Sequence, residues 1–301
     1  MLSQSLDHYL AVRRAAGFKL RNSEWYLHSF VLFANAQGDT HVRIETAIAW
    51  AALASTENER AGRLSIVRLF SRFMHAEDPR YELVPEHVFC GHHQRPTPYI
   101  FTDDELRHLI VEARRLGPPG SLRPHTYDTL LTLLAVTGLR PAAALALRFD
   151  DLTPDGLVIR ETKFRKSRLV PLHETTVAAL QSYQQRRRQI AGHDDHLFVS
   201  LRRRPLTMVS AARTFRKLLQ AAGLSDRQGR PRLHSLRHRF ATRALERCPH
   251  DPDDISRHVV ALSTYLGHVH LQGTFWYLES TPQLMTDIAE HCETFASGGA
   301  L

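Results

Sequence analysis

Two arginines, two histidines and one tyrosine have the types and spacing needed to act on a phosphate ester. Arg140 ends the run Thr-Gly-Leu-Arg, and His234 and Arg237 lie three residues apart. His268 ends the run Leu-Gly-His, and Tyr277 follows nine residues later. An arginine fork donates two parallel hydrogen bonds to a phosphodiester and stays charged near neutral pH. A histidine can transfer a proton, and a tyrosine hydroxyl can attack phosphorus. Together these residues indicate phosphoryl transfer, although each alone could be structural.

Several of these residues fall at or near the expected start of a helix. Arg140 precedes a proline and an alanine- and leucine-rich run to residue 147, so it should lie at a helix N-terminus, where backbone N–H groups favour an anion. His234 and Arg237 share one face of a helix expected over 233–245. His234 and His238 are four residues apart, which leaves a metal site as an alternative. The cationic Arg237 between them opposes a dication, so we expect no metal.

Lys163 is a candidate acid. It lies between two β-prone runs, 157–161 and 168–172, which predict a hairpin. Of the 39 lysines and arginines only four are lysines, and two of them, Lys163 and Lys166, lie in this turn. A lysine whose pKa falls on partial burial can protonate a leaving oxygen, which an arginine cannot readily do. The alternative is a lysine that is merely solvated.

The elements that position these residues are mostly helices, arranged in two predicted domains. Residues 1–93 carry four helical patterns with apolar residues on one face. The two prolines of 94–101 indicate a linker. Thr102, followed by three acidic residues, should cap the first helix of a second domain over 102–301. We therefore predict a mainly α fold with a small β-hairpin or sheet.

Composition favours a polyanionic partner. The formal net charge is +8, which suits nucleic acid but also fits a generally basic surface. The three cysteines are far apart, so we expect no disulfide framework or cysteine-based zinc site and a reducing cytoplasm. No apolar run approaches the ~20 residues that span a bilayer, and no signal-peptide pattern is present at the N-terminus.

Six basic residues are candidates for contacts with DNA phosphates. A solvated basic face is the alternative for this set. The residues are Arg202, Arg203, Arg204, Arg213, Arg216 and Lys217.

In their order and spacing these motifs resemble the tyrosine recombinase (phage integrase) family. Thr-Gly-Leu-Arg140 is similar to the family's first arginine box, and Lys163 to its hairpin lysine, with Lys166 at a second basic position. Residues 233–238 match the H-x-x-R box, 266–268 the L-G-H box, and Tyr277 follows at the usual distance. The resemblance covers most of the chain. It implies a helical core-binding domain, a linker and a mixed α/β catalytic domain.

The resemblance implies site-specific DNA recombination without metal, nucleotide or other cofactor. Tyr277 would form a 3′-phosphotyrosyl link with double-stranded DNA while Lys163 protonates the 5′-hydroxyl. Arg140, His234, Arg237 and His268 would complete the catalytic set. The family also implies roles in DNA integration or transposition of mobile elements, and a tetramer on two DNA sites. An apolar stripe over 284–295 would form a C-terminal helix that docks on a neighbouring subunit, and packing on its own domain is the alternative.

Two features depart from the family pattern. Ala143 stands where the family usually has an acid, and residues 249–258 look like an exposed insertion. Two alternatives follow: a DNA-binding accessory protein of the same fold with weak or no turnover, and a type IB topoisomerase-like enzyme. A metal-dependent nuclease is a further alternative. The target site, the element served and the need for a partner recombinase are not encoded in any motif.

Overall fold

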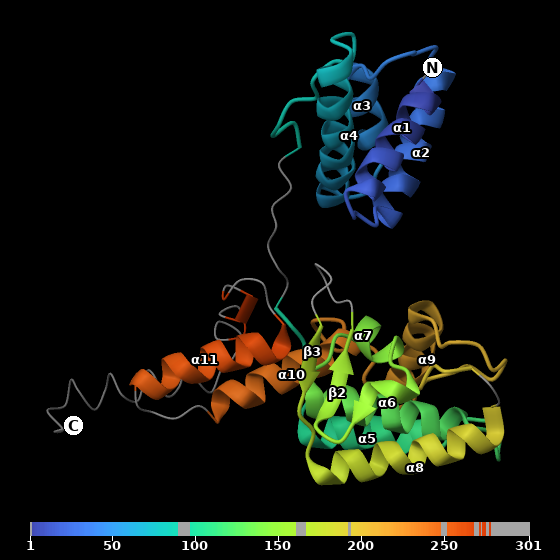
Figure 1. The fold of residues 1–301 in the computed structure, drawn as a ribbon, viewed down its shortest axis with the longest axis vertical. Helices are drawn as coiled ribbons and strands as arrows, with labels where there is room; N and C mark the ends of the chain where they lie inside the picture. The colour runs from blue at the N-terminus through green and yellow to red at the C-terminus, as the bar shows by residue number, and fades with distance from the viewer. Residues whose placement is uncertain are drawn as a thin grey trace, which may run out of the picture. The chain divides into compact units, whose positions relative to one another are not determined.

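The computed structural model describes residues 2–89, 97–160, 167–191, 194–247, 252–267, 271, 273–274 and 277. The chain divides into two compact units, Met1–Arg95 and Pro96–Leu301 (Figure 1). Within the described residues, no helix is long and apolar enough to cross a membrane.

The first unit is a bundle of helices around an aromatic core. Phe30 and Phe70 are fully buried, and Trp50 packs against Phe30 with ring centroids 5.5 Å apart. Thr56 is the N-cap of the last helix of the bundle, and its hydroxyl accepts a hydrogen bond from the backbone N–H of Glu59. Over residues 2–89 the helices are α1 (Leu2–Ala15), α2 (Arg21–Ala36), α3 (Ile44–Ala52) and α4 (Glu57–Glu77).

The second unit is also mainly helical, as predicted. Its first helix has the expected capping box, because Thr102 accepts from the N–H of Glu105 and the Glu105 carboxylate accepts from the N–H of Thr102. The described helices are α5 (Asp103–Arg114), α6 (Arg123–Thr137), α7 (Pro141–Leu145), the 3₁₀ turn η1 (Phe149–Asp151), α8 (Glu174–Ala191), α9 (Met208–Ala221), α10 (Leu233–Glu246) and α11 (Pro252–Leu266).

A small antiparallel sheet interrupts these helices. Strands β1 (Leu152–Thr153), β2 (Gly156–Ile159) and β3 (Arg168–Val170) pair in the order β1-β2-β3. Ile159 lies opposite Arg168, so β2 and β3 form the arms of the predicted hairpin. Residues 161–166 between them lie outside the described part of the chain.

Helix α6 forms the centre of the second unit. It packs against α5, α8 and α10 (Figure 1), and buried residues occur around its circumference. A helix that is apolar on all sides belongs in a core. It ends at Gly138, which has a left-handed backbone (φ 59°), and the chain then turns so that Arg140 stands at the N-cap of α7. The core helix thus fixes the position of Arg140.

Two predicted segments differ in detail from the structure. Tyr99 and Phe101, assigned to the linker, pack onto the second unit: the Tyr99 hydroxyl donates to Glu105 at 2.6 Å and Phe101 is buried. Of the predicted exposed insertion 249–258, residues 249–251 lie outside the described part of the chain. Residues 252–258 form the first turns of α11, and 255–257 are exposed as predicted. Apolar residues at helical spacing later in that helix, Val259 and Leu262, are buried and explain its continuation.

We predict that Gly138→Ala destabilises the second unit more than Gly223→Ala. Both glycines have positive φ, so alanine at either position costs about 1–2 kcal/mol of backbone strain. A Cβ at Gly138 would also lie 2.8 Å from Cγ of Phe240, and such overpacking costs roughly a further 1–3 kcal/mol. At Gly223 no atom lies within 4 Å of that position.

Urea denaturation of the two variants and the wild type measures the difference in the free energy of unfolding. Equal losses in both variants would show that the Phe240 ring does not constrain position 138.

Candidate active site

Two arginines from different helices meet at the turn that follows α11. Arg237 donates from Nη1 to the carbonyl of Gly138 at 2.7 Å and from Nη2 to the carbonyl of Leu266 at 2.9 Å. Arg140 donates from Nη2 to the carbonyl of Gly267 at 3.1 Å. The Leu266–Gly267 turn therefore holds both guanidinium groups in one basin, although their positions in the sequence are far apart.

Arg237 is a buried cation held by a helix with a well-defined start. The hydroxyl of Ser235 accepts from the backbone N–H of Arg232 at 3.1 Å, which caps α10, and Leu233 and Leu236 turn that helix toward the core. Arg237 is only 1% exposed. Burial lowers its pKa to about 10, which Arg140 reinforces and Tyr277 opposes. Arg237 thus remains charged at neutral pH.

Tyr277 lies beside this guanidinium. It is buried in a small apolar cluster with Ala241 and Leu262, and its hydroxyl oxygen accepts a hydrogen bond from Arg237. Its ring centroid is 5.5 Å from that of His238. A phenolic oxygen held by an arginine is placed where a developing phenolate charge is stabilised.

Two histidines on α10 complete the described part of this basin. The rings of His234 and His238 meet edge to face with centroids 4.8 Å apart. Partial burial, then the charges of Arg237 and Arg140, lower the pKa of His234 to about 4. His234 is exposed as a residue, so solvent weakens these effects. Burial, then His234 and Arg237, lower the pKa of His238 to about 4. Both imidazoles are therefore neutral at pH 7.

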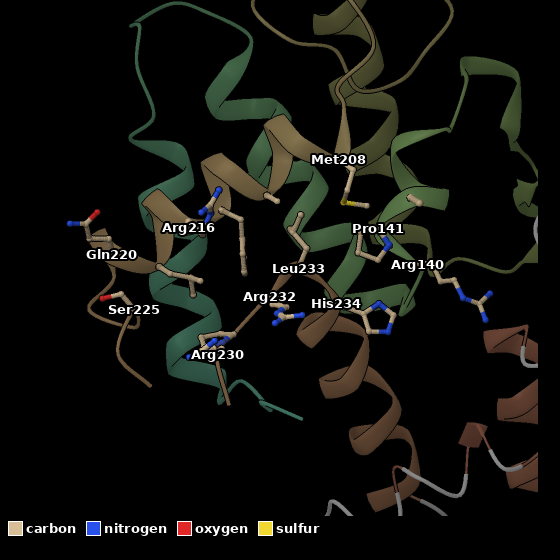
Figure 2. Close-up of a pocket in the computed structure, with 15 residues that line it drawn as sticks. Arg140, Pro141, Met208, Arg216, Gln220, Ser225, Arg230, Arg232, Leu233 and His234 are labelled. Carbon is tan, nitrogen blue, oxygen red and sulfur yellow. The ribbon is translucent and has the colours of Figure 1, made fainter. Parts of the chain in front are cut away.

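A cavity of about 990 Å³ opens beside the basin, between α7, α9 and the segment leading into α10. Figure 2 shows Arg140 and His234 at one end of it and Gln220 and Ser225 at the other. Apolar side chains from α9 and α10 line the cavity together with Arg216, one of the predicted DNA-contacting residues. The basin is therefore open toward a surface that is both basic and apolar.

The six predicted DNA-contacting residues are all exposed in this structure. Arg213, Arg216 and Lys217 are exposed on α9, and Arg216 and Lys217 follow Arg213 by three and four residues, the spacing of one helix face. Arg202, Arg203 and Arg204 lie in the turn closed by the bridge between Val199 and Pro205.

The remaining predicted site residues are placed as follows. Lys163, Lys166, His268 and the stripe 284–295 lie outside the described residues. Ala143 packs, half-buried, against the core of the second unit, and no ion pair joins Arg140 to a carboxylate within the described part of the chain. Among the described residues there is also no cluster of three or more histidine, cysteine, aspartate or glutamate side chains suited to a metal ion.

Two residues in this region were not predicted as site residues. The sequence pattern indicates His238 only as a metal partner of His234, whereas its ring lies beside Tyr277. Its position four residues after His234 on the same helix face was the available signal. Arg168 packs against the Gly267 turn. No sequence signal separates it from the chain's many other arginines.

Comparison with known proteins identifies the class. Residues 99–283 match the phage integrase family. The protein named "Putative integrase/recombinase y4rB" of Sinorhizobium fredii is 39% identical over 303 residues, covering 96% of each chain. The tyrosine recombinase XerD of Brucella abortus is 31% identical over 225 residues, covering 70% of this chain and 71% of XerD. The chain belongs to the phage integrase family of tyrosine recombinases. It is a site-specific recombinase that breaks and rejoins DNA.

Solved structures have the same fold. The XerH site-specific recombinase in a post-cleavage complex with its palindromic difH substrate has a TM-score of 0.68 at 19% identity, covering 97% of this chain and 85% of XerH. A lambda integrase tetramer bound to a Holliday junction has a TM-score of 0.57 at 19% identity, covering 89% of this chain and 77% of that one. The two-domain recombinase architecture predicted from the motifs is thereby confirmed.

Proposed function

We propose that Tyr277 is the nucleophile of this recombinase and that Arg140 and Arg237 bind the scissile phosphate. One observation carries the proposal. Arg237, which lies with Arg140 at the Leu266–Gly267 turn, also donates a hydrogen bond to the Tyr277 hydroxyl. A phosphate held between the two arginines would lie next to that oxygen.

The reaction is a transesterification at phosphorus. The Tyr277 oxygen attacks the phosphate, the bond from phosphorus to the 5′ oxygen breaks, and a 3′-phosphotyrosyl link forms. Lys163 protonates the departing 5′ oxygen. The two arginines neutralise charge on the non-bridging oxygens as the bipyramidal transition state develops. In the reverse step the 5′-hydroxyl of a partner strand attacks the link through a Holliday-junction intermediate, so each broken bond is replaced and no cofactor is required.

Histidines support the proton movements of this reaction. A neutral imidazole can accept the proton that Tyr277 loses on attack. His234 and His238 both have lowered pKa values, so each is in the accepting form at neutral pH. His268, which follows Gly267 directly, is assigned a supporting role at the phosphate.

We expect Tyr277→Phe to abolish covalent protein–DNA complexes while leaving DNA binding intact, because only the attacking oxygen is removed. The protein is incubated with a library of nicked duplexes, which prevents religation, and covalent adducts are separated under denaturing conditions and sequenced.

Tyr183→Phe is the matched control, since Tyr183 is a buried tyrosine of the same unit that stacks on Phe198 away from the two arginines. It should retain adduct formation. Adducts that persist in Tyr277→Phe would refute the assignment. A wild-type protein that binds but forms no adducts would favour the accessory-protein alternative, and relaxation of supercoiled DNA without a preferred site would favour the topoisomerase-like one.

The six exposed basic residues named above are the proposed contacts to the DNA backbone. Their exposure and the +8 net charge support this assignment. Each neutralised phosphate releases counterions, so binding weakens as salt is raised.

Replacing Arg202, Arg203 and Arg204 together by glutamine should weaken DNA binding and flatten its salt dependence. The slope of log affinity against log salt should fall by about 0.9 for each phosphate that is no longer neutralised, or about 2.7 for three. Fluorescence anisotropy measures this salt slope with a duplex whose sequence was recovered in the adduct experiment. The control replaces Arg107 on α5 and Arg115 directly after that helix by glutamine. These arginines pair with Asp104 and Glu112, and their loss should leave the salt slope unchanged. An unchanged slope in the triple variant would remove these residues from the interface.

The assembled form is proposed to be a homotetramer on two DNA sites in the cytoplasm. The lambda integrase tetramer on a Holliday junction supports this arrangement by its shared fold. The proposed link between subunits is the apolar stripe over 284–295, docked on a neighbouring subunit.

Deleting the residues after Leu284 should abolish assembly on paired sites while single-site binding by one protomer persists. Native gel shifts and light scattering on synapsed duplexes measure both properties. Assembly that is unchanged in the truncated protein would exclude the stripe as the docking element.

A further inference from the structure

A third arginine reaches the turn that holds Arg140 and Arg237. Arg168 begins β3, at the base of the hairpin that carries Lys163, and its guanidinium lies against Gly267. A Cβ at position 267 would lie 2.9 Å from Cζ of Arg168, and Gly267 has φ +68°. Only glycine leaves room for this approach without strain. Three guanidinium groups from β3, the N-cap of α7, and α10 therefore meet on one two-residue turn.

The charges of Arg140 and Arg168 have no acidic partner within the described residues. Burial, and then the charge of Arg140, lower the pKa of Arg168, and the charge of Arg168 in turn lowers that of Arg237. The arginines therefore repel one another, and an anion placed between them would relieve that repulsion.

Arg168 also has an unused donor. Its Nε is buried and has no hydrogen-bond partner among the described residues. A buried donor without a partner costs free energy, whereas a charged acceptor with several oxygens can satisfy it together with its neighbours. Tyr265 also interacts electrostatically with Arg168, and its ring stacks on Phe240 with centroids 5.5 Å apart. A neutral phenol supplies no full counter-charge, so an anion would be the stronger partner for Arg168.

We propose that Arg168 is a third phosphate-binding residue of this active site, which donates hydrogen bonds to the same phosphodiester as Arg140 and Arg237. The proposal rests on the proposed function of the basin and deepens it. Arg168 also joins the start of β3 to the Gly267 turn.

The first test uses thermal unfolding of the full-length protein with inorganic phosphate as the probe, at constant ionic strength set with sodium chloride. In wild type, phosphate should raise Tm, because a ligand that binds the folded state stabilises it. In Arg168→Met the rise should shrink to less than half. Without phosphate the variant should unfold at the wild-type Tm or above it, because one repelling charge is gone. Arg107→Met, which removes an exposed arginine on α5, should respond as wild type.

A structural role for Arg168 gives the opposite pattern. If Arg168→Met lowers Tm without phosphate and keeps the full response to phosphate, Arg168 is a packing residue and the proposal is overturned.

The second test measures the rate of covalent adduct formation on the captured nicked duplex. Arg168→Met should slow it about tenfold or more, the scale of a missing hydrogen bond to a charged group, and should lower the salt slope of binding by about 0.9. Arg168→Lys, which keeps the charge, should recover part of both. If Arg168→Met has the adduct rate and the salt slope of the wild-type protein, the role proposed for Arg168 is overturned. The proposed function would still be upheld if the wild-type protein forms adducts and Tyr277→Phe does not. If wild type forms no adducts, the proposed function fails, and the phosphate response still decides whether Arg168 binds an anion.

Discussion

The active site depends on the way the buried guanidinium of Arg237 is satisfied. A charged group that is 1% exposed is tolerated only when its donors have partners. Arg237 finds two of them in the carbonyls of Gly138 and Leu266, at 2.7 and 2.9 Å. Those carbonyls belong to the end of α6 and the end of α11, so one side chain joins three helices. A hydrogen bond to a charged group contributes about 1.5–3 kcal/mol. These two bonds therefore fix the end of α6 and the end of α11 relative to α10.

The two motif glycines explain why the frame can form. Gly138 and Gly267 both have positive φ, and each lies where another side chain comes close: Phe240 at the first and Arg168 at the second. Each ends a helix and leaves a carbonyl pointing at an arginine, Arg237 in one case and Arg140 in the other. The glycine in each motif is thus required by backbone conformation and by space, and the phosphate chemistry next to it depends on both.

Predictions from residue pattern succeeded where the information was local. The capped start of α5 and the pairing of β2 with β3 follow from a capping sequence and two β-prone runs. The family and the mainly helical fold are confirmed, whereas the catalytic roles of Arg140, His234, Arg237 and Tyr277 stay predictions that the geometry supports. The early packing of Tyr99 and Phe101 was missed, because two nearby prolines indicate a linker whether or not its end is buried.

The sequence by itself determined the chemical class, since arginine, histidine, lysine and tyrosine at family spacing suit phosphoryl transfer and little else. Tertiary structure alone decided which groups share a basin. Arg168 is 28 residues from Arg140 and 69 from Arg237, and nothing in its neighbourhood along the chain marks it among so many arginines. Arg237 joins the ends of α6 and α11, and Arg168 at the start of β3 contacts Gly267 directly after α11. Such proximity depends on how distant elements pack, which local residue patterns do not encode.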